Sequence, residues 1–230
     1  MNKRLFLISE YIDDGKGMVD VGTDHGYLPV YMAKQGYTGN IFASDINADP
    51  LNKAIKHASE AGLEDRINFS LSDGLSACPP DEIDTIVIAG MGGDMIVKIM
   101  DEGYWCLDER YKLILQPMSK AEILRYWLVY NGFEIIDERI AEDNNTNYQI
   151  IVTRFGGLTK LNDAELYIGK YELSPDKELY LSQLKALNKR FEKAVKDMKN
   201  GEQAPQSRLK LFEEILEQLK EMDKKYDNNI

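Results

Sequence analysis

The sequence predicts an α/β protein with a doubly wound, seven-stranded sheet closed by an antiparallel pair, followed by a helical hairpin. Over residues 1–157, short apolar runs alternate with segments of helical periodicity, and the last two runs follow one another as a hairpin. From about Asn162 onward, two apolar stripes of three-and-four spacing flank a break at Gly201 and Pro205. We therefore expect an α/β domain over residues 1–157 and a helical coiled-coil hairpin domain over residues 158–230.

Periodicity and turn residues place the elements of the first domain. A short amphipathic helix within residues 3–12, with Lys3 and Arg4 exposed, precedes the first strand. The expected strands are 18–21, 41–44, 67–71, 84–90, 112–115, 133–140 and 148–155. Helices are expected at 27–34, between Asn47 and Gly62, at 94–102, and between Ser119 and Gly132. Ser119 and Glu122 have the spacing of a capping box.

Apolar stripes predict which helix faces are buried. In the first domain they are Leu51, Ala54, Ile55, Ala58 and Ala61, and then Ile123, Tyr126, Trp127 and Tyr130. In the tail they are Leu184, Leu187, Phe191, Ala194 and Met198, and then Leu209, Phe212, Leu216 and Leu219. Two stripes across one turn predict an antiparallel hairpin, although about two and a half heptads each are few for a free-standing coiled coil.

Charge is distributed unevenly along the chain. Of 28 basic and 39 acidic residues, residues 160–230 contain 14 of each, so all eleven excess negative charges lie in residues 1–159. Such acidity argues against a broad nucleic-acid surface on the first domain. The hydrophobic content of 43% is ample for a core, and no run approaches the roughly 20 apolar residues of a membrane span.

The cysteines and the N-terminus favour a reducing compartment. Cys78 and Cys106 stand apart, with no C-x-x-C and no neighbouring histidine, so neither a metal site nor a disulfide is indicated. The first apolar run ends at Ser9 and is too short for the core of a signal peptide. We therefore expect a cytoplasmic protein without a metal centre.

The turn from Met18 to Pro29 is the strongest candidate for a ligand site. Open α/β sheets bind ligands at the carboxyl ends of their strands, and this turn contains Gly22 and Gly26. It lacks the middle glycine of a dinucleotide motif, so the sequence only weakly supports NAD binding. Asp20 and Asp24 would repel a pyrophosphate, and they favour a cation such as the sulfonium of S-adenosylmethionine.

Acidic residues stand at the ends of three successive strands. We expect Asp20 to face the methionine end of the cofactor, Asp45 the ribose hydroxyls and Asp73 the adenine amino group. The other cofactor-binding candidates are Gly22, Thr23, Gly26, Ile46, Asn47, Gly74, Gly90 and Met91. The alternative is that these acids only cap the helices that follow them.

Several short segments carry a family resemblance. They are Val19–Pro29, Ala43–Asn47, Ser72–Leu75, Ile88–Gly93, Leu113–Pro117 and Asn131–Phe133, together with Glu142 and Asp143. They resemble the bacterial tRNA (adenine-22-N1)-methyltransferases over residues 1–157, and the tail is similar to that family's coiled-coil domain. The resemblance implies a class I methyltransferase fold, S-adenosylmethionine as methyl donor, and N1 of one tRNA adenine, at position 22, as acceptor.

Methylation of N1 makes modest demands on the protein. This nitrogen has an in-plane lone pair, so attack on the methyl group needs positioning and no base. Because N1 lies on the Watson–Crick edge, the adenine must be unpaired. Asp24 is the catalytic candidate that stabilises the developing positive charge, with N-cap of a helix starting at His25 as its alternative. His25 is expected to be a polar wall of the pocket and not a base.

An aromatic or apolar slot should hold the target adenine. Its candidates at the same sheet edge are His25, Tyr27, Met91, Gln116, Pro117 and Tyr148. Met91 has the alternative of packing in the core. His57, beside Lys53 and Lys56 on a helix face expected to be exposed, is interpreted as a surface residue.

A basic stripe on the tail is the second candidate for a contact with tRNA. Lys185, Lys189, Lys193 and Lys196 recur at 4-4-3 spacing beside the apolar seam. We hypothesise that they bind tRNA phosphates. A solvated coiled-coil face is the alternative. The rival functions are methylation of another substrate by the same fold, and S-adenosylmethionine binding without catalysis by a protein whose tail docks a partner. We expect a monomer.

Overall fold

The computed structural model describes residues 2–143, 146–201 and 205–227. The chain divides into two compact units, residues 1–159 and 160–230. The first contains the sheet, and the described residues of the second form helices, turns and connecting segments. The loop predicted at 142–147 includes residues 144–145, and the break predicted after Gly201 includes 202–204. These positions lie outside the described residues.

A seven-stranded sheet forms the centre of the first unit. Its strands are β1 (Met18–Val21), β2 (Ile41–Asp45), β3 (Asn68–Leu71), β4 (Thr85–Gly92), β5 (Lys112–Ser119), β6 (Phe133–Asp143) and β7 (Thr146–Phe155). Their order is β3-β2-β1-β4-β5-β7-β6, with β7 antiparallel to β5 and β6 and the other pairs parallel. This confirms the predicted doubly wound sheet. Because the strand order departs from β1 in both directions, the switch point lies between β1 and β4.

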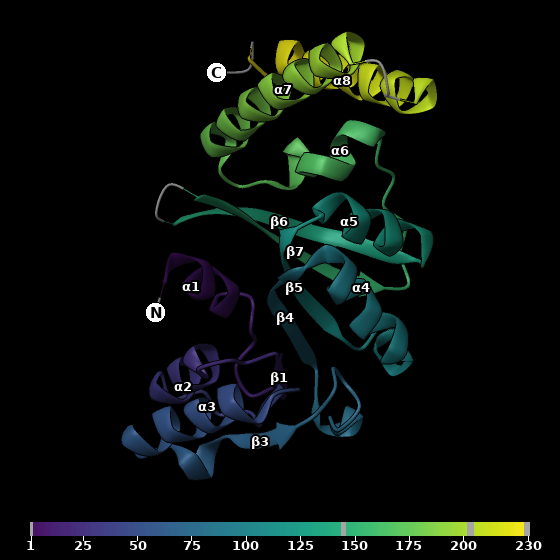
Figure 1. The fold of residues 1–230 in the computed structure, drawn as a ribbon. Coiled ribbons are helices and arrows are strands. Elements are labelled where there is room, and N and C mark those ends of the chain that lie inside the picture. Colours follow the sequence, from purple (N-terminus) through teal and green to yellow (C-terminus); the bar gives the residue numbers. More distant parts are fainter. Residues whose placement is uncertain (1, 144–145, 202–204, 228–230) are drawn as a thin grey trace. The chain divides into compact units, whose positions relative to one another are not determined.

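Helices cover both faces of the sheet. They are α1 (Lys3–Ser9), α2 (Tyr27–Lys34), α3 (Ala48–Glu60), α4 (Gly93–Glu102) and α5 (Ala121–Tyr130), with short 3-10 turns at Glu64–Arg66, Pro80–Glu82 and Tyr104–Cys106. Figure 1 shows α1, α2 and α3 on one side of the sheet and α4 and α5 on the other. The first group buries Ile8, Leu28 and Ala58 against strand residues such as Val87 and Ile114. Burial of these apolar side chains stabilises the layers.

Strand β5 is longer than the sequence predicts. It was expected to stop at Leu115, but it continues to Ser119, with Gln116 beside Ala89 and Pro117 beside Met91. The register shifts at Met91, and such an irregular pairing tolerates a proline because it does not require every ladder hydrogen bond.

Helix α5 begins differently from the prediction. Its N-cap is Lys120, which has a left-handed φ of +56° and makes no side-chain capping bond. The capping box predicted for Ser119 and Glu122 is therefore wrong. Strand β5 continues through Ser119, so this residue belongs to the sheet and cannot open the helix.

The buried faces of α3 and α5 also correct the predicted stripes. Ile55 of α3 is exposed, and so are Ile123, Tyr126 and Tyr130 of α5. The buried residues of α5 are Leu124, Arg125 and Leu128. Arg125 donates through Nε to Glu138 Oε1 of β6 at 2.7 Å, and this buried ion pair lies on the inward face. The periodicity of apolar residues cannot predict a buried polar residue such as Arg125.

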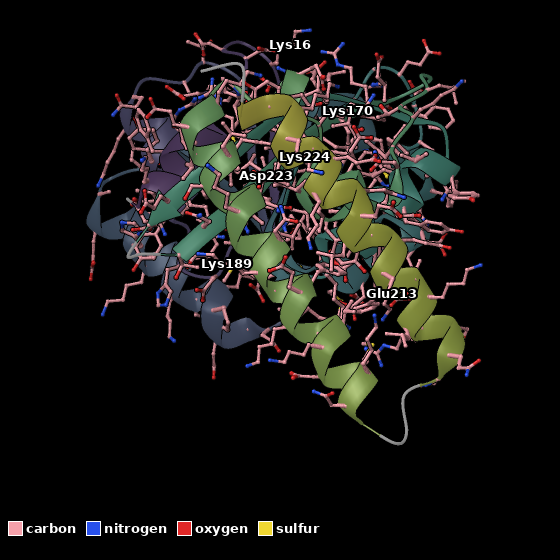
Figure 2. The ribbon with its side chains drawn as sticks, turned by 90° about the horizontal axis from the view of Figure 1, so that it is seen from above. Lys16, Lys170, Lys189, Glu213, Asp223 and Lys224 are labelled. Atoms are coloured by element: carbon pink, nitrogen blue, oxygen red, sulfur yellow. The ribbon has the colours of Figure 1, made fainter. Side chains whose placement is uncertain are left out.

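The second unit is a helical hairpin with a short preceding helix. Its helices are α6 (Asp163–Ile168), α7 (Lys177–Asn200) and α8 (Gln206–Asp227), and Figure 2 shows α7 and α8 side by side. The buried seam contains Tyr180, Leu181, Leu184, Leu187, Asn188, Phe191, Val195, Ile215, Leu219, Met222 and Tyr226. The predicted Ala194, Met198, Leu209, Phe212 and Leu216 are only partly buried. The hairpin prediction is confirmed, with the seam turned slightly from the predicted stripe.

Three further observations concern the described residues. No helix among them has the length and apolar character needed to cross a membrane. None of their His, Cys, Asp and Glu side chains form a group of three or more that could hold a metal ion. Cys78 and Cys106 are free and buried, and burial raises their pKa values to about 11 and about 12.

Candidate active site at the carboxyl edge of the sheet

The turn between β1 and α2 is held in shape by its glycines and by β2. The backbone N–H groups of Gly22 and Thr23 both donate to the carbonyl of Ser44, at 2.8 and 2.9 Å. Gly22 and Gly26 have φ values of +71° and +66°, which favour glycine. A Cβ on Gly26 would also lie 2.9 Å from Cβ of Ala54. The sequence therefore needs glycine here for both conformation and space.

Asp20 is a buried acid at the end of β1. Its side chain is 6% exposed, and Thr23 Oγ1 donates to its Oδ2 at 2.7 Å. Burial raises the pKa of Asp20 to about 6, while the Thr23 hydrogen bond and the Arg4 charge oppose that rise. A carboxylate with so little solvation is stabilised when a cation lies beside it. Thr23 fixes its orientation.

Asp45 ties the first turn to the second. Its Oδ2 accepts from the backbone N–H of Asp24 at 3.2 Å, and its Oδ1 accepts from that of Asn47 at 2.9 Å. The two bonds orient the carboxylate at the end of β2, and its oxygens retain lone pairs for further donors. Ile46, the next residue, is 58% exposed and offers an apolar surface beside this acid.

Asp24 does not cap a helix. Helix α2 begins at Tyr27 with Gly26 as its N-cap, so the alternative of an Asp24 cap is wrong. Asp24 has a φ of +51°, a conformation that costs free energy for a residue other than glycine. Its carboxylate is 64% exposed and lies 3.7 Å from Nε2 of His25. The strained backbone therefore presents an acid to the open side of the turn.

Asp73 and Gly74 lie beyond β3, farther along the same edge. They line a small cavity of about 120 Å³ with residues of α4 and the loop after it. The backbone N–H of Ser72 donates to the Asp45 carbonyl at 2.9 Å, which connects the ends of β2 and β3. No contact among the described residues joins the Asp73 carboxylate directly to Asp20 or Asp45.

Strand β4 brings Gly90 and Met91 to the same edge. The end of the Met91 side chain lies against Gly22, where a Cβ would collide with it. Met91 is partly buried, so one part of its side chain remains accessible at this turn. Gly90 donates through its backbone N–H to Gln116 Oε1 at 3.1 Å, linking the ends of β4 and β5.

Arg4 completes this cluster and was missed by the sequence analysis. The residue was expected to be exposed, but it is partly buried, and its guanidinium donates to Gln116 Oε1 beside Gly90. It also lies over the Tyr148 ring at 5.6 Å from the centroid. Burial lowers the pKa of Arg4, against the opposing influence of Tyr148, Asp20 and Asp143. The sequence carries no signal for this placement, because it depends on how α1 crosses the sheet.

Gln116 and Pro117 were predicted to line the slot for the adenine, but both residues are buried. Gln116 is fully buried, and its Nε2 donates to the Pro117 carbonyl at 2.9 Å. Its Oε1 accepts from both Gly90 and Arg4. Because both the nitrogen and the oxygen of its side-chain amide form hydrogen bonds, Gln116 is held in place and positions Arg4 at the sheet edge.

Three aromatic rings gather beside the first turn. The rings of His25 and Tyr27 stack with centroids 5.4 Å apart, and His57 meets Tyr27 edge-on at 5.4 Å. His57 Nδ1 lies 3.0 Å from the carbonyl oxygen of His25, to which it can only donate. His57 was expected to be an exposed surface residue; its ring is partly buried, and the contact with the His25 carbonyl holds it in place.

The tail lysines belong to the other unit. Lys185, Lys189, Lys193 and Lys196 are all exposed along α7. Figure 2 shows Lys189 on the flank of α7 that points away from α8. The seam between the helices carries its own ion pairs, Lys199 with Glu213 at 2.6 Å and Lys220 with Glu192 at 2.8 Å. These two ion pairs use residues other than the four lysines of the basic stripe.

The residues at the edge fit a nucleoside that carries positive charge. The oriented Asp45 carboxylate suits a pair of ribose hydroxyls, and the buried Asp20 suits an ammonium or sulfonium group. Gly22 and Gly26 give this turn its shape, because Met91 packs against the first and Ala54 against the second. This donor set matches S-adenosylmethionine and is poorly suited to a pyrophosphate.

Comparison with known proteins agrees with this assignment. A family model described as a methyltransferase domain matches residues 1–151. The tRNA (adenine(22)-N(1))-methyltransferase of Bacillus subtilis is 36% identical over 156 residues, which are 68% of this chain and 66% of the relative. The chain thus matches just under two thirds of that relative's length.

Two solved structures match almost the whole chain. One is a candidate tRNA (m1A22) methyltransferase from Streptococcus pneumoniae, solved with S-adenosyl-L-methionine, with a TM-score of 0.82 and 30% identity over 97% of this chain and 99% of that one. The other is TrmK of M. capricolum, solved with S-adenosyl-homocysteine, with a TM-score of 0.79 and 26% identity over 99% and 98% of the two chains. The chain therefore belongs to the methyltransferase-domain family and, within it, to the tRNA (adenine-22-N1)-methyltransferase family, TrmK.

Proposed function

We propose that this protein transfers a methyl group from S-adenosylmethionine to N1 of an adenine in tRNA, at position 22. The observation that carries the proposal is the buried Asp20 beside the oriented Asp45 in a chain of this family. A tRNA substrate would place the activity in the cytoplasm, and we propose that a single chain suffices for it.

Residues from four strand ends would hold the donor. Asp20 faces its ammonium group and Asp45 its ribose hydroxyls. Asp73 with Gly74 receives the adenine, and Ile46 offers that ring an apolar face. The supporting residues are Gly22, Thr23, Gly26, Asn47, Gly90 and Met91. When bound, S-adenosylmethionine supplies an electrophilic methyl group on a sulfonium.

The protein itself has to position the target adenine and stabilise the positive charge that develops on it. Adenine N1 needs no base, so no side chain has to remove a proton before the methyl group is transferred. The exposed carboxylate of Asp24 lies at the rim of the turn and favours the positive charge that the adenine gains. His25, whose ring is stacked on that of Tyr27, forms the adjoining wall, where the unpaired adenine can pack.

The opposite wall is formed by β4, β5 and the neighbouring hairpin. Arg4, supported by Gln116 and lying over Tyr148, defines this wall beside Gly90 and Pro117. A planar guanidinium over a tyrosine ring is a flat, polar surface that can pack against a base. We propose that it orients the adenine so that N1 points toward the methyl group.

The tail lysines would add a second contact with tRNA. Lys185, Lys189, Lys193 and Lys196 present positive charge on α7, in a unit whose acidic and basic residues balance. Each phosphate neutralised by a lysine releases counterions, so binding should weaken steeply with salt. Changing all four to glutamate should weaken tRNA binding and flatten its salt dependence, whereas unchanged affinity at low salt would remove the tail from the proposal.

Product analysis tests the proposed reaction. Unmodified tRNA is incubated with the protein and S-adenosylmethionine, and the digested nucleosides are separated by mass spectrometry. N1-methyladenosine from position 22 is the expected product, and a tRNA with guanosine at that position should remain unmodified. Methylation of another substrate would favour a different methyltransferase. Donor binding without any turnover would favour a non-catalytic module.

A further inference from the structure

Residues at the start of α2 and in the second half of α3 line an open hollow beside the donor turn. Its volume is about 270 Å³, and it is lined by His25, Tyr27, Lys53, Lys56, His57 and Glu60. Figure 1 shows α2 and α3 next to each other at this end of the first unit. We propose that this hollow binds a nucleotide of the tRNA next to the target adenine, an inference that rests on the proposed function.

The aromatic part of the hollow is rigid but uncovered. Tyr27 is 49% exposed although it touches two other rings, His25 and His57. The hydrogen bond from His57 to the His25 carbonyl fixes one ring relative to the turn. A large aromatic surface that is held in place without being buried is what a stacking base requires, and stacking on aromatic side chains tolerates any base.

The basic part of the hollow stands out in an acidic unit. Lys53 and Lys56 are exposed on α3, within the part of the chain that carries all eleven excess negative charges. Lys56 pairs with Glu60 at 3.7 Å, but an exposed pair of this kind contributes little and leaves the ammonium available. Two lysines beside a stacking surface match the two parts of a nucleotide, its phosphate and its base.

The position of the hollow explains why a neighbouring nucleotide would reach it. His25 and Tyr27 follow Asp24 directly on the turn that faces the reaction, and Gly26 packs on Ala54 of α3, one residue from Lys53. A tRNA strand that inserts its target base at Asp24 would therefore lead its next phosphate toward α3. Lys53 and Lys56 would thus provide a positively charged contact for RNA on a domain whose net charge is negative.

The test compares two matched pairs of lysines. Lys53→Gln with Lys56→Gln removes both positive charges and keeps polar side chains at these positions. Lys34→Gln with Lys98→Gln is the control, since these lysines are exposed on α2 and α4, and Lys98 pairs with Glu102 as Lys56 does with Glu60. Binding of tRNA is measured by filter retention over about 50 to 200 mM salt. S-adenosylmethionine affinity and thermal melting are measured on the same samples.

We expect the Lys53/Lys56 variant to bind tRNA about five- to twentyfold more weakly, with a salt slope reduced by roughly 1.5. The control pair should change affinity by less than about twofold, because its lysines contact no phosphate. The single-turnover methylation rate at saturating tRNA should stay at the wild-type value. His57→Gln, which keeps a donor but removes the ring, should weaken tRNA binding without altering the salt slope.

Equal behaviour of the two lysine pairs would overturn the inference. A fall in the rate at saturating tRNA with unchanged binding would overturn it as well, because the lysines would then act on the target adenine. The proposed function fails separately, through absence of N1-methyladenosine with wild-type protein. In that event weaker RNA binding by the Lys53/Lys56 variant alone would still support a nucleotide site.

Discussion

The carboxyl edge of the sheet has two halves that are built differently. The donor half comprises Asp20, whose carboxylate accepts from Thr23, and Asp45, whose carboxylate accepts from the backbone N–H of Asp24. Its side chains are carboxylates, and the charge of Arg4 reaches Asp20 from the neighbouring half. The acceptor half, by contrast, is organised around a cation from another element, Arg4 of α1.

The acceptor half comprises Arg4, Gly90, Gln116 and Tyr148. Here the strand end is glycine, the amide is buried, and the guanidinium lies over an aromatic ring. Charge is therefore distributed unevenly along the edge: the carboxylates of one half suit a positively charged donor, and Arg4 of the other half places a fixed positive charge on the acceptor side. A substitution in one half should therefore change donor binding or adenine orientation without changing the other.

Asp20→Asn should have the largest effect. The substitution keeps a partner for Thr23 but removes the buried negative charge. We expect the Kd for S-adenosylmethionine to rise about 100-fold, the loss typical of a hydrogen bond to a charged group together with its ion pairing. Calorimetric titration measures it. Retained tRNA affinity is the control, and an unchanged donor Kd would exclude Asp20 from the site.

Arg4→Gln should disable the acceptor half. The variant loses the flat guanidinium over Tyr148 and the bond to Gln116. Because orientation of the adenine would be lost, we expect the single-turnover methylation rate to fall about 30-fold. Arg4→Lys should not restore it, since an ammonium lacks the planar fork. Full activity in Arg4→Gln would show that this residue only packs.

Donor binding should depend on pH through Asp20. Its pKa of about 6 in the free protein means that the carboxylate is ionised above pH 6 and protonated below it. Since the cationic donor favours the ionised form, its Kd should rise by up to about tenfold per pH unit below pH 6. Asp20→Asn should show a flat profile over the same range. A wild-type profile without this rise would contradict the role of the acid.

Gly26→Ala tests the shape of the donor turn and should have the smallest effect. A Cβ there meets Ala54 at 2.9 Å in addition to the strain at φ +66°. We expect the free energy of unfolding to fall by about 1–3 kcal/mol. Gly36→Ala is the control, because Gly36 has a φ of +79° and open space around it. Equal losses would mean that packing on α3 contributes nothing.

The sequence allowed the acids of the donor half to be placed at strand ends, but it did not allow Arg4 of the acceptor half to be placed. Asp20 is the penultimate residue of the apolar strand β1 and Asp45 is the last residue of β2, so their positions near strand ends could be predicted from the pattern alone. Arg4 could not be placed, because its role depends on tertiary packing of α1. His57 was missed for a similar reason, since its partner is a backbone carbonyl from α2's leading turn.

Local rules also failed where the sheet overrides them. Gln116-Pro117 resembles a strand end, yet irregular pairing with β4 lets β5 continue to Ser119. On α5 the apolar stripe lies one residue away from the true buried face, because Arg125 pairs with Glu138 inside. In both cases a long-range contact decides what local preference leaves open.

Titration of S-adenosylmethionine into Asp20→Asn and Arg4→Gln, side by side, tests the division of the edge most directly. The two variants should respond differently. Loss of Asp20 raises the Kd about 100-fold, whereas loss of Arg4 leaves the Kd unchanged or lowers it, because a positive charge near Asp20 is removed. A Kd that rises equally in both folded variants would contradict separate donor and acceptor halves.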